Sequence, residues 1–160
     1  MDTYKCCKKV RAILFIITAG LMAFAFIHSS MPADISAEES GSVLSFLQGI
    51  CDFLGFKPEI TDHIVRKSAH FCEYVAIGAM LMSCAFSFNK LKPYKYYINV
   101  MFFGLATAVC DETIQLNVEG RAGMISDVLL DFSGVMLGSL VMLVAFLIYK
   151  KHFISKSENK

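Results

Sequence analysis

Four apolar runs constrain this chain more than any other feature of its sequence. They cover roughly residues 11–28, 69–88, 97–116 and 128–149. A helix needs about 20 mainly apolar residues to cross a bilayer, so each run is long enough, the first one only barely. Because backbone polar groups in lipid must be satisfied within the segment, short spans of this kind must be helices. The sequence therefore predicts an all-α integral membrane protein with four transmembrane helices, in which residues 1–160 form a single domain.

The composition favours a membrane protein over a soluble domain. The chain is 56% hydrophobic and only 18% charged, which is too apolar for a soluble domain of this length. The first run also resembles a signal peptide, because it has a basic flank and an apolar stretch. No small-x-small cleavage site precedes Met31, so we expect the run to be kept as the first span. The six cysteines include no CxxC pair, and we expect no structural disulfide.

The distribution of basic residues predicts the orientation of the spans. Eleven of the fifteen Lys and Arg residues lie in the N-terminal flank, the 89–96 loop and the C-terminal tail. A four-span topology places these three segments on one side of the membrane, and most of the acidic residues on the other. Since Lys and Arg concentrate in cytoplasmic loops, we expect both termini in the cytoplasm.

The segment between the first two runs is expected on the outer side. Residues 31–41 are acidic and predict an exterior loop. Residues 42–56 place apolar side chains at mostly helical spacing but are too short to span. They predict an extracytoplasmic amphipathic helix, which either lies across the outer mouth of the bundle or anchors a loop among the lipid head groups. Thr61 or Asp62 is the expected N-cap of the second span.

The last run contains two glycines four residues apart, Gly134 and Gly138, in a GVMLG arrangement. Small residues at this spacing let two helices approach closely in a membrane. We expect them to serve packing within this chain rather than dimerisation.

Ionisable and polar residues gather near the outer ends of three runs. Those on the second run are three and four residues apart, which places Lys67, His70 and either Glu73 or Tyr74 on one helix face. The third run ends on a DExxQ pattern, and the fourth begins on DxxxD. The topology places all three groups at the same depth, in the outer leaflet. The candidate ligand-binding residues are Lys67, His70, Glu73, Tyr74, Asp111, Glu112, Gln115, Arg121, Asp127 and Asp131.

The cost of burying carboxylates predicts where these side chains face. A charged side chain deep in a bilayer costs about 2.5–3.5 kcal/mol even on the lenient insertion scale. Glu73, Asp111, Glu112 and Asp131 should therefore face inward. There they pair with basic residues or line a wet cavity that opens to the outside.

Three other interpretations of this cluster stay open. One is a buried network that locks the helices together, although buried ion pairs stabilise poorly compared with apolar packing. Another is a metal site, because His70 and Glu73 at i, i+3 beside carboxylates have ligand-like spacing. Nucleophilic catalysis is the weakest, since Ser68, Ser126 and Ser133 stand in no recognisable order with a histidine and an acid.

Two segments, 66-RKSAHFCEYVAIG-78 and 111-DETIQLNVEGRAGMISDVLLDFSGVMLG-138, carry a resemblance to a known family. They resemble the VanZ-like family of small bacterial membrane proteins, named for a teicoplanin-resistance accessory protein. The resemblance covers roughly residues 60–145, with the KxxHxxEY and DExxQ…GR…DVxxD patterns in the expected order. Glu119 departs from it, because family members often have proline before the GR pair, and this alters the turn that carries Arg121.

The resemblance implies a multi-pass protein of the bacterial plasma membrane with a role in the cell envelope. In at least one member that role is reduced susceptibility to the lipoglycopeptide teicoplanin. Teicoplanin carries an acyl chain, so an outward-facing polar cleft beside lipid suits such an amphiphile, or a cell-wall lipid that it targets.

We expect a binding protein rather than an enzyme, with a lipoglycopeptide or a lipid-linked envelope precursor as the ligand. Lys67 and Arg121 would engage an anionic phosphate or carboxylate. Asp111, Glu112 and Asp127 would engage cationic or hydroxyl-rich groups. We expect no cofactor, no resident metal and no nucleic-acid partner.

Two alternatives come from other classes of protein. The first is a small membrane enzyme acting on a lipid-linked envelope substrate, with His70 or Glu73 as the general acid–base and the carboxylates holding a divalent cation. The second is a structural partner of a larger complex.

Overall fold

A computed structural model describes residues 7–53, 55, 61–90 and 92–151 of the chain. Within these residues the protein is helical and contains no strand. The elements are α1 (Lys8–Ser29), α2 (Ala33–Phe53), α3 (Asp62–Phe88), the short 3-10 helix η1 (Pro93–Tyr96), α4 (Tyr97–Gln115) and α5 (Ile125–Tyr149).

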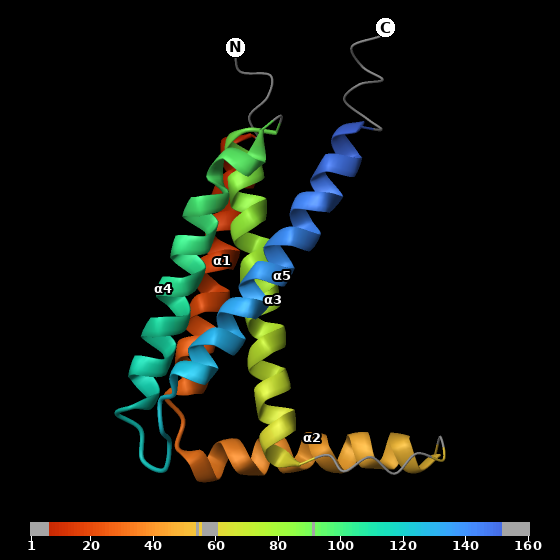
Figure 1. Cartoon of the computed structure of the whole chain (residues 1–160), viewed down its shortest axis with the longest axis vertical. Coiled ribbons are helices and arrows are strands. Elements are labelled where there is room, and N and C mark those ends of the chain that lie inside the picture. Colours follow the sequence, from red (N-terminus) through yellow and green to blue (C-terminus); the bar gives the residue numbers. More distant parts are fainter. Residues whose placement is uncertain (1–6, 54, 56–60, 91, 152–160) are drawn as a thin grey trace, which may run out of the picture.

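Four of these helices form a bundle. α1 and α4 lie beside α3, α5 crosses α3 obliquely, and α2 runs across one end of the bundle (Figure 1). α3 is the central helix, since it packs against α5, α1 and α4. α1 begins and α5 ends at the end of the bundle opposite α2 (Figure 1).

Among the residues that the structure describes, three helices are long and apolar enough to cross a membrane, namely α1, α3 and α5. α4 is 19 residues long and lies among them, but its last turns carry Asp111 and Glu112, which lower its mean hydropathy. The prediction of an all-helical, membrane-type protein is therefore confirmed. The fourth span remains a prediction that rests on the sequence.

α2 corrects the expectation for the segment after the first span. Most of residues 31–41 are not a loop, because the helix begins at Ala33 and continues without a break to Phe53. Alanine and glutamate in the stretch AEES favour helix, and Asp34 in the first turn complements the positive end of the helix dipole. The polar composition alone had indicated a loop.

Glycines bring α5 into direct contact with α3. A Cβ on Gly134 would lie 2.7 Å from the backbone oxygen of Phe71, and one on Gly138 would overlap the backbone oxygen of Val75. On the α3 side, a Cβ on Gly78 would overlap the backbone of Val135. The expectation that the GVMLG pair packs within this chain is confirmed, since both of its glycines face α3.

α3 is fixed by a cap at its start and by packing in the core. Thr61 is its N-cap, and the Thr61 hydroxyl accepts a hydrogen bond of 3.4 Å from the backbone N–H of Ile64, as predicted. Further along the helix, Tyr74 and Ile77 are buried in a core cluster with Ala108 of α4 and Val135 of α5. These contacts fix the rotation of α3, and with it the face that carries the polar residues.

The five cysteines among the described residues are free.

Candidate functional site

A polar pocket of about 250 Å³ lies at the end of the bundle near α2. It forms where the first turns of α3 and α5 meet the last turn of α4 and the loop from residue 116 to residue 124. Its lining residues are His63, Arg66, Lys67, His70, Glu112, Gln115, Gly120, Arg121, Ala122, Met124, Asp127, Leu130 and Asp131.

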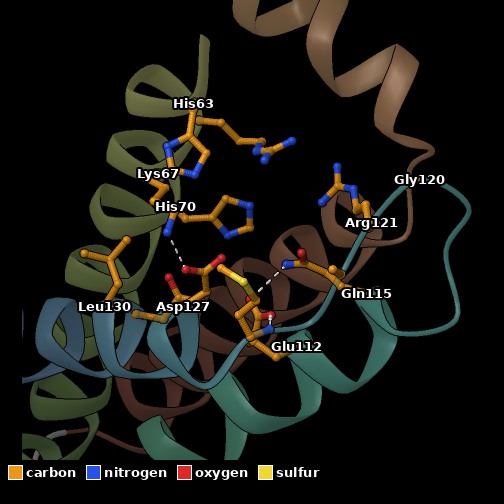
Figure 2. Close-up of a pocket in the computed structure, with 13 residues that line it drawn as sticks. His63, Lys67, His70, Glu112, Gln115, Gly120, Arg121, Asp127 and Leu130 are labelled. Carbon is orange, nitrogen blue, oxygen red and sulfur yellow. Dashed lines mark hydrogen bonds and ion pairs between the residues drawn. The ribbon is translucent and has the colours of Figure 1, made fainter. Parts of the chain in front are cut away.

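α3 supplies one basic wall of the pocket. His63, Lys67 and His70 recur at spacings of four and three residues, which puts them on one face of the helix, and they line one side of the cavity (Figure 2). The Lys67 ammonium donates to Oδ1 of Asp127 on α5 at 2.6 Å. This ion pair joins the first turns of the two helices.

The end of α4 supplies the acidic and amide groups. Asp111, Glu112 and Gln115 are 0%, 5% and 8% exposed. The Gln115 amide donates to Oε1 of Glu112 at 3.1 Å, and the hydroxyl of Ser29 at the end of α1 donates to Oδ2 of Asp111 at 2.6 Å. The carboxylates of α4 face the bundle and not lipid, as their burial cost predicted.

The loop after α4 carries Arg121 into the pocket. The second oxygen of Glu112, Oε2, accepts from the backbone N–H of Met124 at 3.0 Å. The turn at Gly120 has a φ of +74°, a conformation that side chains other than glycine disfavour. The Arg121 guanidinium donates to the backbone oxygen of His28 at 3.4 Å. His70 and Arg121 point toward each other from opposite sides of the cavity (Figure 2).

Seven of the ten predicted site residues line the pocket, and three lie elsewhere. Glu73 faces α1, where its carboxylate is 3.5 Å from Nδ1 of His28. Tyr74 is fully buried in the core, and its hydroxyl donates to the backbone oxygen of Thr107 at 3.4 Å. Asp111 is buried among the helices next to His70, whose Nδ1 is 3.9 Å from Oδ2 of Asp111.

Four residues of the site were not among the predicted set. His63 and Arg66 line the pocket on α3. His63 is four residues before Lys67 and Arg66 is four residues before His70, so extending the three- and four-residue spacing toward the start of the helix would have found them. His28 and Ser29 come from the end of α1. They stand at the end of the first run that the predicted topology places outside, so their expected depth in the membrane was the available signal. The ring of His28 stacks on that of His70 with centroids 5.8 Å apart.

Some buried carboxylate oxygens of the site accept no hydrogen bond from the described residues. They are Oε2 of Glu73, Oδ1 of Asp111 and Oδ2 of Asp131. A buried carboxylate oxygen without a donor is costly. Asp111 and Asp131 are 0% and 1% exposed, and a nitrogen of His70 lies close to an oxygen of each.

The fold and the site together define a small helical membrane protein with a charged pocket at one end of its bundle. A family model described as VanZ/LLP1 matches residues 14–148, which include α3 and α4, most of α1 and α5, and every residue that lines the pocket. The chain belongs to the VanZ/LLP1 family. No curated protein and no solved structure matches it significantly.

Proposed function

We propose that this protein binds the anionic head group of a lipid-linked cell-envelope compound in the pocket between α3, α4 and α5. The observation that carries the proposal is the convergence of Arg66, Lys67 and Arg121 on a cavity at the N-terminal ends of α3 and α5. Helix N-termini add partial positive charge and favour anions. Such a site suits a phosphate or a carboxylate.

Arg66 is a cation of the pocket that a ligand can engage. Lys67 is already engaged by Asp127 at 2.6 Å. Arg66 is half-buried and has no ion-pair partner among the residues that the structure describes. An arginine presents a planar set of donors that matches the oxygens of a phosphate or carboxylate. Arg66 and Arg121 are therefore the two residues that we assign to the anionic group.

The surroundings of the pocket favour a ligand with an apolar chain. Ile64 of α3 is 50% exposed, and Ile125 and Leu129 of α5 are 81% and 62% exposed. These side chains lie on the same helix turns as the pocket residues, so an acyl or isoprenoid chain can lie along them while its head group enters the cavity. A volume of about 250 Å³ is too small for a whole glycopeptide, because even the pockets that hold drug-sized ligands measure roughly 300–1,000 Å³. The lipid-linked precursor is thus favoured over the antibiotic itself.

The proposed orientation puts the pocket on the outside of the bacterial plasma membrane. Basic residues lie near the end of the bundle opposite α2, in the first turn of α1, in η1 and just after α5. By the bias of Lys and Arg toward cytoplasmic segments, this end is cytoplasmic and both termini are inside. The topology has four spans, with α4 as the third. A role in glycopeptide susceptibility follows from sequestering or presenting an envelope precursor at the outer face.

α2 is the proposed interfacial helix. Val43, Phe46, Ile50 and Phe53 recur at three- and four-residue spacing and are between 41% and 90% exposed. A stripe of this kind on a helix that runs across the bundle end (Figure 1) fits a position among the lipid head groups. With α2 in this position, the pocket would lie at the depth of the lipid head groups.

Replacing Arg66 by alanine tests the proposal. We expect farnesyl phosphate, presented to the purified protein in nanodiscs, to bind about ten- to a hundredfold more weakly, since a hydrogen bond to a charged group contributes about 1.5–3 kcal/mol. Lys95→Ala removes the same charge at the opposite end of the bundle, and should bind as the unchanged protein does. Farnesol, which lacks the phosphate, should bind neither protein measurably.

Equal binding of farnesyl phosphate by the Arg66→Ala variant and the unchanged protein would contradict the proposal. Release of inorganic phosphate in the same experiment would instead support the enzyme alternative, in which His70 transfers a proton at the bound head group. A parallel measurement of teicoplanin susceptibility in cells that make each variant tests the envelope role. We expect the Arg66→Ala variant to lose whatever protection the unchanged chain gives.

A further inference from the structure

We propose that His70, Asp111 and Asp131 form a binding site for one divalent metal ion at the floor of the pocket. The three residues come from three helices, α3, α4 and α5. One imidazole nitrogen and one oxygen of each carboxylate all lie within 4.8 Å of one another. The metal site needs no bound lipid to form, because all three of its metal-binding side chains belong to the protein.

The unsatisfied oxygens of the two aspartates point to a cation. Both carboxylates are almost completely buried, and Oδ1 of Asp111 and Oδ2 of Asp131 accept no hydrogen bond from the described residues. Buried charges in proteins are normally paired or bound to metal. The nearest lysine of the pocket wall, Lys67, is held by Asp127 instead. A metal ion bound between the two aspartates would compensate the negative charge of both carboxylates at once.

The spacing of His70 and Asp111 fits a first-row divalent ion, and the ligand atoms of all three residues lie within 4.8 Å of one another. Each ligand atom of a bound Zn²⁺ lies about 2.0–2.2 Å from the metal, so neighbouring ligand atoms are roughly 3–4 Å apart. Nδ1 of His70 is 3.9 Å from Oδ2 of Asp111, inside that range. One imidazole with two carboxylates suits Zn²⁺ or Mn²⁺ better than Mg²⁺ or Ca²⁺, which prefer oxygen ligands alone.

Neighbouring side chains hold the ligands in place. The Ser29 hydroxyl donates to Oδ2 of Asp111 at 2.6 Å, and the Gln115 amide lies 3.4 Å from the same oxygen. The ring of His28 stacks on that of His70. Contacts of this kind orient metal ligands in known sites. His70 and Asp131 also line the pocket, which gives an ion a path from outside and leaves its open coordination position facing the cavity.

The structure corrects the sequence-based metal hypothesis in one residue. In the metal alternative drawn from the sequence, Glu73, three residues after His70, was a candidate ligand. Its carboxylate is instead 3.5 Å from His28 on α1. Asp131 of α5 takes its place beside His70 and Asp111.

Metal binding by the purified full-length protein tests the proposal directly. The chain in nanodiscs is stripped with chelator and titrated with Zn²⁺ and, separately, with Mn²⁺, in the absence of any lipid-linked phosphate. We expect about one ion per chain, with affinity at least tenfold weaker in the Asp131→Asn variant. Asp62→Asn removes an exposed carboxylate from the first turn of α3 and should leave the affinity unchanged. No saturable binding by the unchanged protein, or equal binding by Asp131→Asn, would overturn the proposal.

A second variant keeps the test decisive if the Asp131→Asn protein does not fold. His70→Cys replaces the imidazole by a thiolate, and should shift the preference of the site toward Cd²⁺ and produce a thiolate-to-cadmium absorption band that the unchanged protein lacks. A network that only locks the helices together through a shared proton predicts no such band. The readout does not involve phosphate, so failure here is distinguishable from failure of the proposed lipid binding.

Discussion

Replacing Gly138 by valine should separate α5 from α3 and prevent stable folding. A Cβ at this position would overlap the backbone oxygen of Val75, which cannot move away as the end of a side chain can. Overpacked cores typically lose about 1–3 kcal/mol, and occasionally more. Because the overlap is with backbone and α3 is the central helix, we expect a loss of more than about 3 kcal/mol.

The measurement is thermal unfolding of the protein in detergent, followed by circular dichroism and by the fraction that stays monodisperse. Gly20→Val is the matched control. Gly20 is on α1, and a Cβ there meets no atom within 4 Å, so its melting temperature should change little. A Gly138→Val variant as stable as Gly20→Val would mean that α3 and α5 are not packed as described.

Replacing Glu112 by alanine should weaken anion binding although it removes a negative charge from the pocket. Coulomb repulsion alone predicts that a phosphate binds more tightly once this carboxylate is gone. Glu112, however, accepts a hydrogen bond from the backbone N–H of Met124 and so ties the loop that carries Arg121 to the end of α4. Without that tie, binding must also order the loop, and we expect about a fivefold to tenfold loss of affinity for farnesyl phosphate.

Glu112→Gln separates the two effects. The glutamine side-chain oxygen can still accept from Met124, while the charge is gone. We therefore expect this variant to bind the phosphate as tightly as the unchanged protein or more tightly. If Glu112→Ala also bound more tightly, Glu112 would act through its charge alone and the proposed positioning role would be wrong.

The sequence predicted the facing of the carboxylates because the penalty for exposing charge to lipid leaves few alternatives. Asp111, Glu112 and Asp131 are buried inside the bundle, as that penalty requires. The positions of Glu73 and Tyr74 were harder to predict. Residues three and four apart share a broad face, and spacing alone does not distinguish the part of α3 that meets α1 from the part that meets the pocket.

Other parts of the site depend on contacts that no local pattern encodes. His28 and Ser29 are two polar residues at the end of an apolar helix. Ser29 contacts Asp111 and His28 contacts Glu73, and each partner is more than forty residues away in sequence. The helical start of α2 was missed because acidic residues are common both in loops and in the first turns of helices. The close approach of α5 to another helix, in contrast, could be predicted from Gly134 and Gly138, since glycines at that spacing commonly let two helices pack closely in a membrane.

The charged residues that line the pocket balance in number, with consequences for how its two proposed ligands affect each other. Two arginines and a lysine face one glutamate and two aspartates. An anion entering this cavity meets attraction from Arg66 and Arg121 and repulsion from the uncompensated carboxylate of Asp131. A divalent cation on Asp131 and Asp111 changes the sum to positive. Each ligand then raises the affinity for the other by the same factor, and the protein becomes a detector of their joint presence.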